Sequence, residues 1–449
     1  MAATPEAAPI SRAAAPSEAL YGKLNPGPGL QAQEVASHQR ARIHSAMIEI
    51  AGGEGYESVT VRELVNLAGV STRAFYLHFR DKEDCFLRTY ELVVQRTTTR
   101  IVAAQNGERG WLERMRRAFE AFANEIAREP RSARLALVEP YAVGPTALEM
   151  VRRTDCLFEA MVAESLARAP EPFEIPPLVI KGMVAGVSRV ARARLLSGRA
   201  GDMPGLARQL QRWVLSFNDP AAGRLKGLDP RPNERRPLSP EATLPFMGQS
   251  LREDDRTLIL TAVAKLVASE GYSQLTIPRI RTAAGVSRRN FNTYFEGVED
   301  CFLAALERRA TTAIRAAAEH EYASGDDWAR RVDTTVSRLC ARIIGDPLLS
   351  RLAFVDAFAP GIAGLRCREN ITTSLAKSFD AGAPPCLGSE EVASEASIGA
   401  IWAILHHYAV TGRTAELPRI APTLSYLALA PAIGAPAAEE TIRDGQERH

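Results

Sequence analysis

The stretch GVSTRAFYLHF, Gly69 to Phe79, carries the local signals of a tight turn followed by a short helix. Gly69 can adopt the positive φ that a turn after a helix needs, and Ser71 can cap the next helix by accepting an amide hydrogen bond. Phe75 and Phe79 stand four residues apart, so they share one face of that helix. The stretch therefore predicts a helix whose aromatic face is buried.

The other face of this helix is polar. It presents Thr72, Arg73 and Tyr76, a set that suits contacts in the major groove of DNA. The preceding segment completes a helix-turn-helix, because Thr60 and Glu63 have the spacing of a capping box and an apolar stripe follows them. Many all-α domains also contain a pair of short helices, so the pattern alone leaves a simple packing role open.

A longer run around the turn makes the interpretation more specific. GYESVTVRELVNLAGVSTRAFYLHFRDKEDCF, residues 55–86, resembles the N-terminal DNA-binding domain of TetR/AcrR-family transcriptional regulators. Those domains share a Gly-Phe/Tyr pair, a Thr, an AGVS turn, an aromatic-Tyr-x-His/Tyr-Phe helix and a Lys-Glu pair opening the fourth helix. The resemblance implies a sequence-specific DNA-binding regulator, most often a repressor that leaves DNA when a ligand enters its helical core.

The same pattern occurs a second time in the chain. GYSQLTIPRIRTAAGVSRRNFNTYFEGVEDCFL (271–303) aligns with residues 55–87 at a displacement of 216 without a gap, and fifteen of the 33 positions are identical. Weaker matches follow: LALVE (135–139) with LAFVD (352–356), and LLSGRAGDMP (195–204) with AVTGRTAELP (409–418). The sequence therefore predicts a duplicated whole regulator rather than a duplicated motif.

We accordingly expect an all-α fold with two tandem TetR-like units. Each unit is an N-terminal three-helix helix-turn-helix domain followed by a helical ligand-binding and dimerisation domain. The DNA-binding domains are predicted at 37–87 and 251–303, and the regulatory domains at 88–217 and 304–431. Six prolines indicate an extended linker at 218–250, and we expect a disordered tail at 1–36 and a loose tail at 432–449.

Each copy supplies candidate DNA contacts. In the first copy, phosphate contacts are expected from Thr60, Tyr76, His78 and Lys82, and base-edge contacts from Ser71, Thr72 and Arg73. The second copy offers Thr276, Ser287, Arg288, Arg289, Asn292 and Tyr294. An arginine paired with guanine discriminates against the wrong base by about 1–3 kcal/mol.

The second copy departs from the family pattern at three positions. Asn292 replaces the tyrosine, Tyr294 stands at the histidine position, and Val298 replaces the lysine, which weakens the usual phosphate contacts. Asn292 can nevertheless pair with adenine. Four arginines also precede the first acid, Glu296: Arg279, Arg281, Arg288 and Arg289. Two hypotheses remain: a second DNA-binding head with its own sequence preference, or a degenerate copy kept for dimerisation.

Small residues indicate where helices approach closely. Gly182, Ala185, Gly186 and Ser188 keep one helix thin, so that another backbone can come near. In the family the last two helices form a four-helix dimer interface. We therefore expect either an intrachain pseudo-dimer that binds an asymmetric site or a homodimer with four heads, with simple packing inside one domain as the alternative.

The effector is expected to be an unknown small molecule. Candidate pocket residues are large aromatics of the regulatory domains: Trp111, Phe119, Phe122, Tyr141 and Phe158 in the first copy, and Trp328, Phe358 and Trp402 in the second. Ordinary core packing would produce the same helical spacing, so both interpretations stay open.

Composition excludes several other classes. The net charge of +2 argues against a wholly basic nucleic-acid binder but leaves local patches possible. Six scattered cysteines without a CxxC pair favour reduced thiols over structural zinc. No nucleotide-binding or nucleophile motif occurs in context, so we expect no catalysis and no cofactor. Without a signal peptide or a membrane-length apolar run, we expect a cytoplasmic protein whose partner is double-stranded operator DNA.

Overall fold

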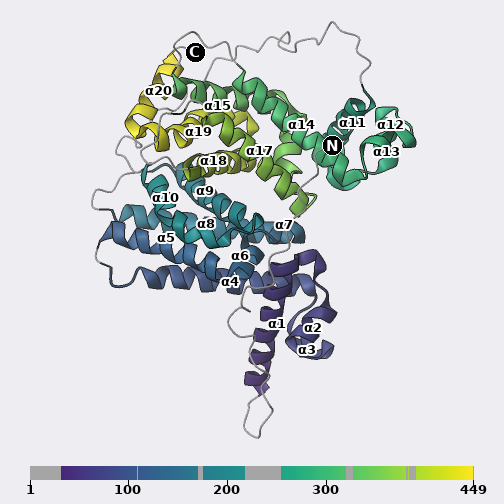
Figure 1. The fold of residues 1–449 in the computed structure, drawn as a ribbon, viewed down its shortest axis with the longest axis vertical. Coiled ribbons are helices and arrows are strands. Elements are labelled where there is room, and N and C mark those ends of the chain that lie inside the picture. The colour runs from purple at the N-terminus through teal and green to yellow at the C-terminus, as the bar shows by residue number, and fades with distance from the viewer. Residues whose placement is uncertain are drawn as a thin grey trace. The chain divides into compact units, whose positions relative to one another are not determined.

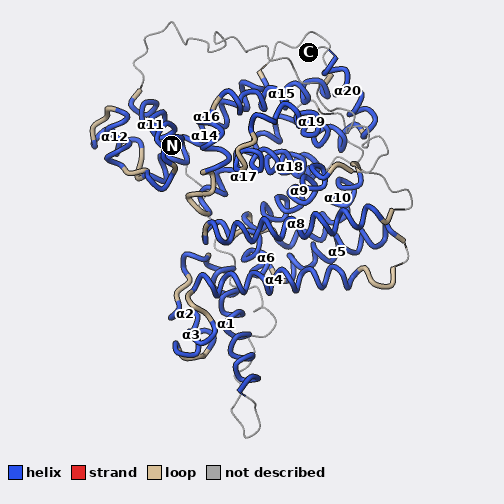
Figure 2. The backbone as a smooth tube through the Cα atoms, turned by 180° about the vertical axis from the view of Figure 1, so that it is seen from behind, coloured by secondary structure: helices blue, strands red, loops and turns tan. Residues whose placement is uncertain are grey.

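The computed structural model describes residues 32–108, 110–169, 175–217, 254–319, 327–380, 383 and 391–447, and every regular element among them is helical (Figures 1 and 2). The chain divides into two compact units. One takes its described residues from Met1–Met161 and Ser188–Gln211, the other from Val162–Val187 and Arg212–His449. The predicted all-α class is confirmed.

Two predicted segments fall largely outside this description. The linker at 218–250 lies outside the described residues, and so does the tail up to residue 31. The first helix, α1, spans Ala32–Glu54 and therefore begins inside the stretch that we expected to be disordered.

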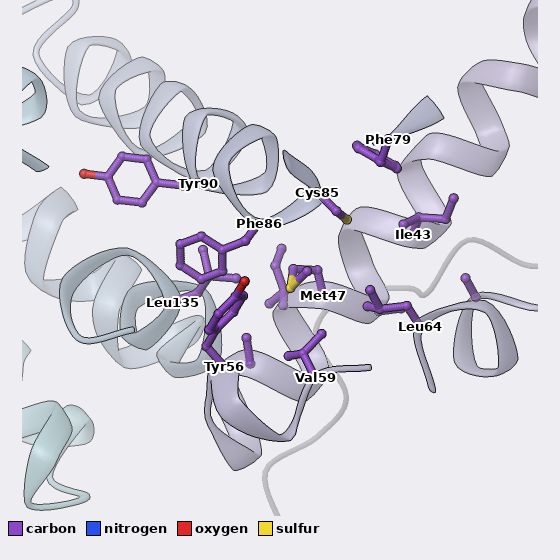
Figure 3. Close-up of a cluster of buried hydrophobic side chains, with 14 of the residues drawn as sticks. Ile43, Met47, Tyr56, Val59, Leu64, Phe79, Cys85, Phe86, Tyr90 and Leu135 are labelled. Carbon is purple, nitrogen blue, oxygen red and sulfur yellow. The ribbon is translucent and has the colours of Figure 1, made fainter. Parts of the chain in front are cut away.

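The first helix-turn-helix, called head 1 here, consists of α1, the short 3-10 turn η1 (Tyr56–Ser58), α2 (Val61–Ala68) and α3 (Thr72–His78). Its apolar residues share one core with the following helices, as Figure 3 shows. Met47 and Leu64 of head 1 are fully buried together with Phe86 of α4 and Leu135 of α6. Head 1 is therefore packed onto α4 and α6 rather than tethered to them by a flexible segment.

The rest of the first copy is a set of longer helices. They are α4 (Lys82–Ala104), α5 (Trp111–Arg128), α6 (Pro130–Leu137), α7 (Pro140–Val143), α8 (Pro145–Ala167), α9 (Pro177–Leu196) and α10 (Met203–Leu215), with the 3-10 turn η2 (Ala200–Asp202). Asp81 caps α4 by accepting the amide hydrogen of Asp84 at 2.8 Å. A carboxylate at this position also suits the positive end of the helix dipole.

The second copy repeats this order of elements. Head 2 consists of α11 (Asp255–Glu270), η5 (Tyr272–Gln274), α12 (Ile277–Ala284) and α13 (Arg288–Tyr294). It is followed by α14 (Val298–Ala318), α15 (Trp328–Gly345), α16 (Pro347–Ser350), the π-helical turn η6 (Arg351–Val355), α17 (Ile362–Asp380), α18 (Glu391–Val410), η7 (Thr414–Glu416), α19 (Leu417–Ile433) and α20 (Ala435–Glu447).

The C-terminal helix α20 corrects one expectation. Its Ala- and Pro-rich sequence suggested a loose tail from residue 432, but α20 packs against α15 and α19. Pro436 falls in the first turn, where a helix tolerates proline, and Ala438 and Ile442 bury one face. Tertiary burial therefore outweighs the composition of this segment.

Within the second unit, stretches of α9 and α10 pack against α18 and α19. A Cβ added at Gly186 would come within 2.6 Å of the Ala396 carbonyl oxygen and 2.5 Å of the Trp213 ring. The indole Nε1–H of Trp213 donates to Ser397 Oγ at 3.0 Å in a buried contact. The sequence predicts that another backbone approaches Gly186 closely. The backbone that does so belongs to α18 of the second copy.

Candidate nucleic-acid interface

The turn between α2 and α3 is fixed by local hydrogen bonds. Thr60 and Glu63 form the predicted capping box, with Glu63 N–H donating to Thr60 Oγ1 at 3.2 Å and Thr60 N–H donating to Glu63 Oε2 at 3.1 Å. Gly69 ends α2 with a left-handed φ of 60°, and Ser71 accepts the Ala74 amide hydrogen at 3.1 Å. These features orient α3 as the sequence predicts.

The two faces of α3 are divided as predicted. Phe75 is fully buried and Phe79 is 2% exposed, with their ring centroids 5.5 Å apart. Thr72 and Arg73 are exposed, and Tyr76 is 57% exposed. Arg73 therefore lies on the side of α3 opposite the buried phenylalanines.

Three other candidate contacts of head 1 are engaged within the protein. Lys82 Nζ donates to the Val59 carbonyl oxygen at 3.1 Å and lies 4.6 Å from the centre of the Tyr56 ring. The Thr60 hydroxyl donates to Glu63 at 2.8 Å, and the His78 ring contacts the Gln39 side chain at 3.3 Å. The Thr60 bond belongs to the predicted capping box, whereas the contacts of Lys82 and His78 were not predicted from the sequence.

Head 2 repeats the same turn with weaker capping. Gly285 ends α12 at a left-handed φ of 68°, and Ser287 accepts the Asn290 amide hydrogen at 3.1 Å. Phe291 is fully buried. Thr276 precedes α12 but forms no side-chain cap, and Arg279 stands where a capping box has its glutamate. The geometry of the recognition helix is kept although one of its supporting bonds is lost.

The exposed face of α13 is strongly polar. Arg288, Arg289, Asn292 and Tyr294 are all exposed. One expectation for this head is corrected: Arg279 forms an ion pair with Glu270 of α11. Glu270 lies before the repeated segment 271–303, so it was not considered when the arginines of that segment were described as having no nearby acid. Arg281 of α12 is half-buried, so Arg288 and Arg289 of α13 are the exposed arginines that remain as candidates in head 2.

The predicted pocket aromatics of the first copy are buried to different extents. Tyr141 is buried, and its hydroxyl accepts from Arg192 Nη1 at 3.2 Å. Trp111, Phe119, Phe122 and Phe158 are half-buried. A groove of about 380 Å³ instead opens between α4 and α8. It is lined by Tyr90, Glu91, Val94, Gln95, Thr98, Thr99, Met150, Arg153, Thr154 and Leu157, and by none of the five predicted aromatics.

The predicted aromatics of the second copy lie near buried polar groups. Trp328 donates its indole N–H to the Phe379 carbonyl oxygen at 2.7 Å. The ring centroids of Trp402 and Phe354 lie 4.7 Å apart with the rings tilted by 39°, and Phe354 belongs to the π-helical turn. The ring centroids of Phe358 and His406 lie 5.5 Å apart, and the Arg368 guanidinium lies 5.2 Å from the centroid of the Phe358 ring.

Two features of the interface were not found from the sequence. Leu77 of α3 is 74% exposed, although the sequence predicts that an apolar residue at this position is buried. Glu139, fully buried beyond α6, accepts the backbone N–H of Tyr56 in head 1 at 2.9 Å. The only available signal was the partial match of 135–139 with 352–356, which places an acid at the same point of both copies.

Other kinds of site find little support in the described part of the chain. None of its helices is long and apolar enough to cross a bilayer. Its His, Cys, Asp and Glu residues form no cluster of three that could hold a metal ion. Burial raises the pKa of the Cys85 and Cys301 thiols to about 12, so both stay protonated and unreactive.

Comparison with known proteins gives an independent view of both heads. Residues 43–89 and 259–305 match the family model described as bacterial regulatory proteins, tetR family. The HTH-type transcriptional activator FasR of Mycolicibacterium smegmatis is 25% identical over 132 residues, which cover 28% of this chain and 60% of that protein. The chain thus spans about 60% of the length of this curated relative.

Two solved structures align with part of the chain. The fatty acid degradation regulator FadR from Bacillus halodurans covers 38% of this chain and 96% of its own, with 16% identity and a TM-score of 0.36. A TetR-like transcriptional regulator from Rhodococcus sp. RHA1 covers 40% of this chain and 96% of its own, with 17% identity and a TM-score of 0.33.

Proposed function

Because the chain is a tandem member of the TetR family of bacterial regulatory proteins, we propose that it is a sequence-specific transcriptional regulator that binds double-stranded operator DNA. The family consists of regulators rather than enzymes. The observation that carries the proposal is the division of α3: Phe75 is fully buried while Arg73 is exposed beside Tyr76. This arrangement leaves an arginine facing outward on a rigidly held helix, as major-groove recognition requires.

Salt dependence tests DNA binding directly. Duplexes selected from random oligonucleotides by the full-length protein are titrated at increasing salt and followed by fluorescence anisotropy. We expect one preferred sequence, and a logarithm of affinity that falls linearly with the logarithm of salt by about 0.9 for each phosphate contact. A protein that prefers no duplex and shows no salt slope would instead be a protein-binding module that has lost DNA affinity.

We further propose that head 2 also binds DNA, with a sequence preference of its own. The exposed Arg288, Arg289 and Asn292 support this, because they offer donors suited to guanine and adenine. Head 2 has fewer supports for phosphate contacts, since Val298 replaces Lys82 and Gly297 replaces the capping Asp81. The alternative is a copy kept for dimerisation, in which case removing Arg289 would leave the DNA site unchanged.

The pairing of the two copies is proposed to occur within one chain. Its support is the contact of Gly186 and Trp213 with Ala396 and Ser397, which joins the last helices of the first copy to those of the second. Two heads paired in this way would bind half-sites about 34 Å apart, one turn of DNA, or a multiple of it. Sedimentation tests the proposal: we expect one 48.8 kDa chain per DNA site. Two chains per site would indicate a homodimer with four heads.

We propose that a small-molecule effector acts through the groove between α4 and α8. Since α4 is packed against head 1 at its start and lines the groove further along, a molecule that enters the groove would move α4 and change the orientation of head 1. A Leu157→Trp substitution fills the groove with protein atoms and is expected to weaken DNA binding. The matched control is Leu112→Trp, at an exposed leucine outside the groove.

The sign of regulation is proposed to be repression that the effector relieves. The relative FasR is named an activator, so a promoter–reporter measurement must decide for this chain. Under the proposal, deleting the coding sequence raises expression from a promoter that carries the selected site. A fall in expression would assign activation and leave DNA binding itself untouched.

A further inference from the structure

Leu77 occupies an unusual place on the recognition helix of head 1. It is 74% exposed, more than any other large apolar side chain in the part of the chain that the structure describes. It stands four residues after Arg73 and next to Tyr76, so the three side chains lie along one strip of α3. We call Thr72, Arg73, Tyr76 and Leu77 the reading face of head 1.

The chemistry of the major groove limits what an apolar side chain can contact there. Base edges present hydrogen-bond donors and acceptors, and the one apolar group among them is the C5-methyl of thymine. A leucine can bond neither to a phosphate nor to a polar base edge. We propose that Leu77 reads a thymine methyl group in the half-site of head 1, close to the base that Arg73 reads.

The corresponding position of head 2 is different. Thr293 lies 216 positions after Leu77, is exposed, and donates its hydroxyl to the Arg289 carbonyl oxygen of its own helix at 3.0 Å. Its side chain is shorter than that of leucine, and its hydroxyl is already engaged. Head 2 can therefore offer only the single methyl group of Thr293 to a thymine at this position, a smaller apolar surface than that of leucine.

The two reading faces differ at three of four aligned positions. Arg73 and Arg289 match, whereas the other three pairs differ: Thr72 with Arg288, Tyr76 with Asn292, and Leu77 with Thr293. The half-sites should therefore share the base read by the common arginine and differ beside it, with the thymine belonging to head 1. This specificity rests on the proposed DNA-binding function.

Replacing thymine by deoxyuridine tests the inference, because it removes the methyl group and changes nothing else. The half-site of head 1 is first defined as the half that Arg73→Ala no longer selects. Each thymine in it is then replaced singly in duplexes bound by the full-length protein. At one position we expect about fourfold weaker binding, the effect of one apolar methyl contact.

A double-mutant cycle ties this loss to Leu77. In Leu77→Ala the same replacement should have no effect, whereas in the control Leu112→Ala it should keep its full effect, since Leu112 is exposed on α5. Thr293→Leu should create a new dependence on a methyl group in the half-site of head 2. Because Leu77 is exposed, thermal unfolding of Leu77→Ala should match that of the unaltered protein.

Two outcomes separate this inference from the function on which it rests. If the protein binds a specific site but no thymine replacement weakens binding twofold, Leu77 reads no methyl group and the regulator assignment stands. A head 1 half-site that contains no thymine would likewise rule out a methyl contact by Leu77 and leave the regulator assignment unchanged. If no specific site is found at all, both the function and the inference fail.

Discussion

The Glu139 carboxylate accepts a hydrogen bond of 2.9 Å from the backbone N–H of Tyr56, 83 residues earlier in the chain. The matching residues of the second copy make the same bond, since Asp356 accepts from the Tyr272 N–H at 3.3 Å. Each carboxylate also pairs with the arginine five residues before it in the sequence, Arg134 for Glu139 and Arg351 for Asp356. In each copy, the helices that follow the head therefore bind it at the start of the short turn that precedes its second helix.

Removing Glu139 should destabilise the first unit strongly. Glu139 is fully buried, burial raises its pKa, and Arg134 Nε lies 2.9 Å from its carboxylate, which favours the charged form. Glu139→Ala leaves both the Tyr56 N–H and the Arg134 charge without this partner, at a cost of about 3 kcal/mol. Denaturant unfolding measures the loss.

The second copy supplies the matched comparison for that loss. The Arg351 side chain that faces Asp356 is 41% exposed, so water can solvate it when the acid is removed. Asp356→Ala should therefore cost about 1 kcal/mol, clearly less than Glu139→Ala. An equal loss of unfolding free energy in the two variants would contradict the conclusion that burial strengthens the contact between Glu139 and Tyr56.

Two helical glycines should respond oppositely to alanine. Gly186→Ala forces a methyl group against the Ala396 carbonyl oxygen and the Trp213 ring, and should destabilise the second unit by about 1–3 kcal/mol. Gly205→Ala in α10 meets no atom within 4 Å and should stabilise by about 0.5–1 kcal/mol, because alanine favours a helix. Thermal unfolding of the two variants checks the pair, and a stabilising Gly186→Ala would exclude the close approach.

Stability should fall in mild acid because of His44. Burial, reinforced by the nearby charges of Arg40 and Arg88, lowers the pKa of His44 from 6.5 to about 4. Between about pH 6.5 and 4, His44 is protonated in the unfolded chain but still neutral in the folded protein. The free energy of unfolding is therefore unaffected by His44 above pH 6.5 and decreases as the pH falls to 4. The loss amounts to about 2–3 kcal/mol.

The variant His44→Gln isolates this contribution. It should unfold with a smaller dependence on pH across the same window, as measured by denaturant titration at several pH values. An unchanged pH dependence would assign the acid sensitivity to other groups.

Lys82→Ala should affect stability as well as DNA affinity. The sequence alone predicts weaker binding to all DNA sequences alike, through a lost phosphate contact. The structure adds the bond from Lys82 to the Val59 carbonyl oxygen and the contact with the Tyr56 ring, which together contribute about 1 kcal/mol. Thermal unfolding should show this loss, while Arg62→Ala on the exposed face of α2 should show none.

The heads could be predicted because their signals are local. Gly69, Ser71 and the spacing of Phe75 and Phe79 all act within a few residues, and the fold of α2 and α3 follows from them. The gapless repeat then extended the same conclusion to head 2.

What the sequence did not reveal depends on distant partners. Glu139 meets Tyr56 across 83 residues, and Arg279 meets Glu270 from the helix before the motif. α20 is helical because Ala438 and Ile442 are buried against other helices, which its composition alone does not indicate. Leu77 was overlooked because an apolar residue in a short helix suggests core.

The central claim is that one chain carries two unequal DNA-reading heads, and site selection with two variants tests it most directly. The full-length protein, Arg73→Ala and Arg289→Ala each select duplexes from the same random pool. We expect the unaltered protein to select one asymmetric site, and each variant to lose sequence preference in a different half of it. If Arg289→Ala selects the same site as the unaltered protein, or if both variants lose the same half, the second head does not read DNA.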